Sequence, residues 1–138
     1  MAAKLIALDA DDLAVISAHV QNATVVVADI LWRQADKRLV IGMRRPDWEQ
    51  MLDGATAPRR RVAVLRFDRV LACRSRNIDL NAPHATLDLL GVEFHSTSPP
   101  GGTAVLMFEG GAALRLDVEC LECELADLGV DPGEPSPL

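Results

Sequence analysis

The sequence predicts one α+β domain built on an antiparallel sheet, and three observations support this fold class. Apolar and polar residues alternate along much of the chain after residue 23, which is the period of half-buried strands. A helical period occurs near each end, over residues 9–22 and 118–129. Turn residues separate the alternating segments at short intervals, as in antiparallel hairpins. We therefore expect a seven-stranded antiparallel β-barrel or sandwich with an N-terminal helix and a short C-terminal helix.

Length and composition agree with a single domain. The chain has 138 residues, of which 49% are hydrophobic and 25% are charged, and this is enough to bury a core without disulfides. We assign residues 1–130 to the domain and expect residues 131–138, "DPGEPSPL", to form a disordered tail.

Several features predict a cytoplasmic protein with no membrane association. No apolar run approaches the roughly 18 to 20 residues that span a bilayer. Acidic residues interrupt the opening "MAAKLIALDADD" too early for a secretory signal. The 3 cysteines are an odd number without framework spacing, which fits a reducing compartment.

The first element is predicted to be a helix that begins after Asp9. The Asp9 side chain can cap the helix, and Asp12 follows at the third position. Leu13, Ile16 and Val20 recur at helical spacing, so we expect one face of the helix to be buried.

The same segment offers an enzymatic alternative. "LIALDADDLA" resembles the first motif of the haloacid dehalogenase-type phosphatases, and this resemblance implies Asp9 as nucleophile and Asp11 as acid/base. That chemistry also needs Mg²⁺, further acidic ligands, a Ser or Thr and a Lys, gathered by a parallel sheet. The rest of the chain has no repeating strand–helix pattern, and its one downstream lysine, Lys37, falls in a predicted turn. We therefore interpret the aspartates as a helix start and assign no catalytic residue.

Residues 24–45 are predicted to form a hairpin with its turn at 34–37. If Arg33 faces Arg38, three apolar pairs fall on one face: Trp32/Leu39, Ile30/Ile41 and Ala28/Met43. Arg33, Arg38 and Arg44 then share the opposite face.

The middle of the chain continues the alternating pattern. Residues 46–58 are expected to be a connection with one turn of helix, and residues 59–77 two strands broken near Asp68. A further strand is expected over residues 85–96, with a β-bulge at Gly91.

The last hairpin is predicted from Gly110 and Gly111, which suit a two-residue turn. Such a turn places Met107 opposite Leu114. One continuous apolar face then contains Val105, Met107, Leu114, Leu116 and Val118.

The C-terminal segment "DVECLECELADLG" is expected to become helical. Val118, Leu121, Leu125 and Leu128 form one apolar stripe, and Gly129 suits the helix end. The opposite side of such a helix would carry Cys120, Cys123 and Asp127. A zinc site normally needs four ligands, and no second C-x-x-C or H-x-x-H accompanies the first. We therefore expect no metal and no cofactor, and keep metal or redox use of these three residues as the alternative.

Charge is divided unevenly although the net charge is -6. Residues 33–76 hold 12 of the 14 basic side chains, whereas residues 77–138 hold 11 of the 20 acidic ones. One interpretation is that the basic and acidic halves meet, within one molecule or across a homodimer. The other is that the basic segment binds an anionic partner.

The preferred hypothesis is a non-enzymatic binding or adaptor domain that recognises an acidic protein through an arginine-rich face. Arginine offers a planar fork that suits carboxylate or phosphate. Nucleic acid ranks below a protein partner, because the chain is acidic and only 4% aromatic. A small enzyme with a carboxylate or histidine pocket stays the rival. The expected binding residues are Arg33, Lys37, Arg38, Arg44, Arg45, Arg59, Arg60, Arg61, Arg74 and Arg76.

Two resemblances accompany these expectations. Seven antiparallel strands followed by a helix is similar to the layout of pleckstrin-homology-like domains, and this resemblance implies phosphoinositide binding through basic residues of the first hairpin, here Arg33, Lys37 and Arg38. "LIALDADDLAVISAHVQNA", "RFDRVLACRSRNID" and "GGAALRLDVECLECELADLG" resemble an uncharacterised alphaproteobacterial family, domain of unknown function 2948. The second resemblance implies a bacterial setting and brings no functional residues.

Overall fold

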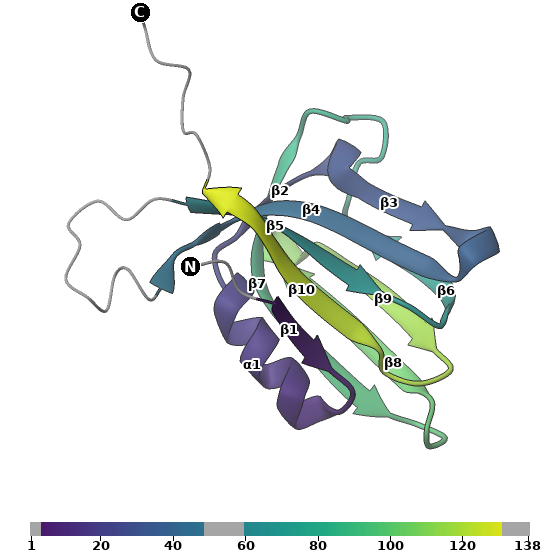
Figure 1. The fold of residues 1–138 in the computed structure, drawn as a ribbon. Helices are drawn as coiled ribbons and strands as arrows, with labels where there is room; N and C mark the ends of the chain where they lie inside the picture. The colour runs from purple at the N-terminus through teal and green to yellow at the C-terminus, as the bar shows by residue number, and fades with distance from the viewer. Residues whose placement is uncertain (1–3, 49–59, 131–138) are drawn as a thin grey trace, which may run out of the picture.

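Ten strands and one α-helix build the fold (Figure 1) in residues 4–48 and 60–130, which the computed structural model describes. The helix is α1 (Ala10–Val20). The strands are β1 (Lys4–Ala7), β2 (Thr24–Val26), β3 (Ile30–Arg33), β4 (Arg38–Pro46), β5 (Arg60–Phe67), β6 (Val70–Arg76), β7 (Thr86–Ser96), β8 (Gly102–Phe108), β9 (Ala113–Val118) and β10 (Cys123–Val130). Three 3₁₀ turns connect them: η1 (Val27–Asp29), η2 (Gln34–Asp36) and η3 (Glu109–Gly111).

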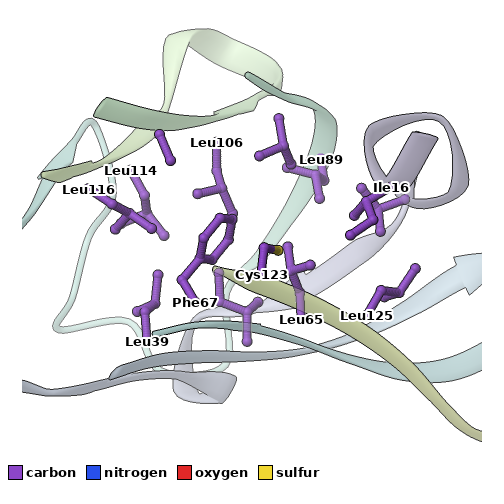
Figure 2. Close-up of a cluster of buried hydrophobic side chains, with 14 of the residues drawn as sticks. Ile16, Leu39, Leu65, Phe67, Leu89, Leu106, Leu114, Leu116, Cys123 and Leu125 are labelled. Carbon is purple, nitrogen blue, oxygen red and sulfur yellow. The ribbon is translucent and has the colours of Figure 1, made fainter. Parts of the chain in front are cut away.

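The strands form one open antiparallel sheet. Its hydrogen-bonded order is β1-β10-β5-β4-β2-β7-β8-β9-β6, and β3 pairs with β4. Strand β2 pairs with both β4 and β7, so it joins two halves of the sheet. Leu39 and Phe67 from one half and Leu106 and Leu116 from the other meet in one core (Figure 2). The fold is therefore α+β and sandwich-like, and the expectation of a seven-stranded barrel is wrong in strand number and closure.

Helix α1 begins as predicted. The Asp9 carboxylate accepts a hydrogen bond of 2.8 Å from the Asp12 backbone N–H, which satisfies one of the free donors at the helix start. Leu13, Ile16 and Val20 are buried where α1 packs against the sheet. The helix lies beside β1 and β7 (Figure 1).

The first hairpin has the predicted register over β3 and β4. Arg33 lies opposite Arg38, and the pairs Trp32/Leu39 and Ile30/Ile41 follow. The pair Ala28/Met43 does not form, because η1 interrupts the strand before it reaches Ala28. The predicted break at Asp68 and the bulge near Gly91 are both present.

The C-terminal helix is absent, and a strand takes its place. Residues of β10 pair with β1 on one side and with β5 on the other. Cys123 and Leu125 point into the core, so burial in this segment follows the two-residue period of a strand and not the predicted helical period. Leu128, which the stripe would bury, is 67% exposed. Gly129 follows a register shift in the strand rather than a helix end.

The last hairpin is one residue out of the predicted register. Met107 lies opposite Ala113 and Leu106 opposite Leu114, because η3 makes a three-residue connection and Phe108 bonds to Ala112. A register shift of one residue moves the side chains that would be buried to the exposed face of the strand, and the exposed ones to the buried face. The buried face of β8 therefore consists of Ala104, Leu106 and Phe108.

Three expectations are not decided by this structure. Most of the 46–58 connection and the tail at 131–138 lie outside the described residues. The pleckstrin-homology-like layout stays a prediction.

Within the described residues, no helix combines the length and apolar character needed to cross a bilayer.

Candidate functional site

Basic side chains of the central segment meet acidic side chains of the C-terminal half within the molecule. The ion pairs, with their N–O distances, are Lys37–Glu119 (2.6 Å), Arg66–Glu124 (2.7 Å), Arg69–Glu122 (3.4 Å) and Arg45–Asp127 (2.7 Å). The Lys37 ammonium lowers the pKa of the Glu119 carboxyl through a hydrogen bond. Part of the basic middle and part of the acidic C-terminal half therefore neutralise each other through ion pairs within the folded molecule.

A depression at the tip of the first hairpin illustrates this neutralisation. It encloses about 330 Å³, and its lining residues are Asp36, Lys37, Arg38, Asp68, Arg69 and Glu122. Arg38 donates to Asp68 at 2.7 Å, and this hydrogen bond raises the pKa of the guanidinium. Three cationic and three anionic side chains offset one another here. The depression is therefore poorly suited to a single anionic ligand.

Two of the predicted binding residues face inward. Arg45 is 2% exposed and donates two hydrogen bonds, of 2.8 and 2.7 Å, to the Asp127 carboxylate. Arg61 is 9% exposed and donates to Asp47 at 2.9 Å. These guanidinium groups hold strands together and are not available at the surface.

The other predicted arginines lie on two separate faces. Arg33, Arg38 and Arg44 share the outer face of β3 and β4, as predicted, and Arg60 lies beside them on β5. Arg60 donates to the carbonyl oxygens of Arg44 (3.0 Å) and Asn22 (3.3 Å). Arg74 and Arg76 lie on β6, in the other half of the sheet, and Arg59 is outside the described residues.

The outer face of β6 and β9 holds three exposed arginines, which we call the arginine cluster: Arg74, Arg76 and Arg115. Arg74 lies directly opposite Arg115 across the two strands, and Arg76 is two residues further along the same face. The Asp117 carboxylate lies 3.5 Å from the Arg115 guanidinium. In the described part of the chain, Arg74 and Arg76 form no ion pair.

A shallow groove of about 400 Å³ adjoins the arginine cluster. Arg115 and Asp117 line it on β9, Glu119 lines it just after that strand, and the loop 97–101 forms another side. Leu71, which is 51% exposed, adds an apolar contact surface. Of the described residues that line the groove, Arg115 is a cation and Asp117 and Glu119 are anions, so the groove contributes apolar surface and the arginine cluster contributes the positive charge.

Arg115 was not among the predicted binding residues. Alternation placed it on the polar face of the last hairpin, but no local pattern showed that β6 would pair with β9. Only this long-range pairing brings Arg115 to Arg74.

The proposed metal or redox residues do not converge. Cys123 and Asp127 are four residues apart on a strand, about 13 Å along its axis. Cys123 is 2% exposed in the core, and Asp127 is bound to Arg45. All 3 cysteines are free thiols. Within residues 4–48 and 60–130, no group of three or more His, Cys, Asp or Glu side chains is placed to hold a metal ion.

Cys123 is expected to resist alkylation in the native protein. Burial raises the pKa of its thiol, so the reactive thiolate is scarce at pH 7.5. Iodoacetamide followed by peptide mass spectrometry should leave Cys123 unmodified until urea unfolds the chain. Rapid native labelling, or a Cys120–Cys123 disulfide formed by oxidised glutathione, would restore the redox interpretation.

The three histidines lie on separate elements. His19 hydrogen-bonds with the Val15 carbonyl oxygen (2.9 Å), and His95 contacts Glu93 (3.0 Å). His84 is exposed between β6 and β7. Their positions provide no support for the rival enzyme hypothesis.

Comparisons with known proteins identify a family. A comparison with curated proteins finds no match, and a comparison with solved structures finds none either. One family model matches residues 3–136, nearly the whole chain. The chain therefore belongs to the family described as "Protein of unknown function (DUF2948)".

Proposed function

We propose that this protein is a non-enzymatic binding domain that holds an acidic segment of a partner protein against the arginine cluster. The observation that carries the proposal is the placement of Arg74 directly opposite Arg115, with Arg76 on the same face. Like charges opposite each other on a sheet destabilise the fold. Carboxylates of a partner would remove this repulsion and form charge-assisted hydrogen bonds with the guanidinium groups.

An acidic protein fits this face better than nucleic acid does. The net charge of -6 repels every anion at long range, and it repels a long polyphosphate more strongly than a short segment with a few carboxylates, which three clustered arginines suit. Leu71 in the adjoining groove offers an apolar contact that a protein segment can use. The free thiols agree with a cytoplasmic location.

The proposal is tested with a fluorescein-labelled peptide of alternating Glu and Val residues, measured by fluorescence anisotropy at low salt. Replacing Arg74, Arg76 and Arg115 together with Gln should weaken binding between about threefold and about 150-fold. Each exposed arginine–carboxylate pair contributes roughly 0.2–1 kcal/mol to the binding free energy, and the variant removes three such pairs. Raising the ionic strength should weaken binding to the unaltered protein as well.

The control for position is Arg33→Gln, which removes one exposed arginine from the other half of the sheet. It should leave peptide affinity nearly unchanged. Equal affinities of the triple variant and the unaltered protein would overturn the proposal. Tighter binding of a DNA duplex than of the peptide would instead favour nucleic acid.

A further inference from the structure

Strand β6 is an edge of the sheet with most of its outer side uncovered. It is the last strand in the hydrogen-bonded order and pairs only with β9 among the described strands. The first residue, Val70, donates its N–H to the Lys37 carbonyl oxygen at 2.9 Å. Ser75 is exposed although its cross-strand partner, Leu114, is buried. The remaining edge therefore offers backbone groups and side-chain surface to another strand.

We propose that β6 accepts an extended acidic segment of the partner protein as an additional strand. This inference rests on the proposed function and specifies how the partner binds. An added strand receives backbone hydrogen bonds from the edge, while alternate side chains determine its identity. The available edge, residues 72–76, spans about 16 Å, which accommodates about five residues of a partner.

The side chains of β6 define the sequence pattern of the segment. Arg74 and Arg76 point to the outer face, so an added strand needs carboxylates at alternate positions to meet them. On the other face, Cys73 is half-buried against the core beside Ser75. Small or apolar residues suit that side. The expected segment alternates acidic and apolar residues.

The charges favour an acidic partner over a second copy of the chain at this edge. Pairing two β6 edges would place the arginines of one molecule against those of another, which is unfavourable. Charged residues on an edge strand also discourage such self-pairing, and this role would be a sufficient reason for the presence of Arg74 and Arg76 on β6. It does not explain Arg115, because β9 lies between β8 and β6 and has no free edge.

The test compares three peptides of identical charge, each with the sequence Glu-Val-Glu-Val-Glu-Val-Glu. One is unmodified, one is N-methylated on the Glu nitrogens and one on the Val nitrogens. In an added strand only alternate N–H groups face β6, so one methylated peptide should bind about tenfold or more weakly than the other. Hydrogen exchange measured by mass spectrometry should slow over residues 72–76 when the unmodified peptide is bound.

The outcomes separate this inference from the proposed function. Equal binding of both methylated peptides, with affinity still dependent on the arginine cluster, would overturn strand addition and leave the proposed function standing. Affinity that does not depend on Arg74, Arg76 and Arg115 would overturn both. The Arg33→Gln variant is the control, and it should retain the difference between the two methylated peptides.

Discussion

Replacing Asp127 with Ala is expected to lower the free energy of unfolding by about 3–5 kcal/mol. The Arg45 and Asp127 side chains are 3% and 0% exposed and share two hydrogen bonds. Removing the carboxylate leaves the buried Arg45 guanidinium without its charge partner. Because the guanidinium stays buried, water does not replace the lost interaction. Urea denaturation followed by circular dichroism measures this loss.

Two further variants make the Asp127 result interpretable. Glu122→Ala removes a carboxylate from an exposed pair with Arg69, whose side chains are 45% and 59% exposed, and should cost about 1 kcal/mol or less. Replacing Arg45 with Met and Asp127 with Leu removes both buried charges and should recover much of the stability lost in Asp127→Ala. A loss below about 1 kcal/mol for Asp127→Ala would show that Arg45 finds water or another acceptor.

Local patterns predicted most elements whose pairing is also local, although the register of the last hairpin was wrong by one residue because η3 is a three-residue connection. The cap at Asp9 and the register of the first hairpin depend on residues close in sequence, and both are confirmed. The segment after Val118 carried a helical and an alternating pattern at once. Its place between β1 and β5 is set by residues more than 50 positions away, so tertiary pairing selected the strand.

The candidate site was predictable only in part for the same reason. Composition pointed to the central arginines, and alternation placed Arg33, Arg38 and Arg44 on one face. Sequence alone could not show that Asp127 neutralises Arg45, because the two residues are 82 positions apart. The pairing that joins Arg115 to Arg74 is likewise non-local, so charge clustering became visible only in the folded sheet.

Leu106→Ala is expected to cost about 2–5 kcal/mol, whereas Val105→Ala at the adjacent position should cost about 1 kcal/mol or less. Leu106 is fully buried and lies against Phe67 in the core (Figure 2), while Val105 lies between Glu93 and Arg115 on the outer face. The two substitutions test the register of the last hairpin, since a two-residue turn at Gly110 and Gly111 would bury Val105 instead. Urea denaturation of both variants measures the difference, and a larger loss for Val105→Ala would require that alternative register. The same register places Arg115 opposite Val105 on the outer face, beside Arg74, so confirming it would also support the geometry of the arginine cluster.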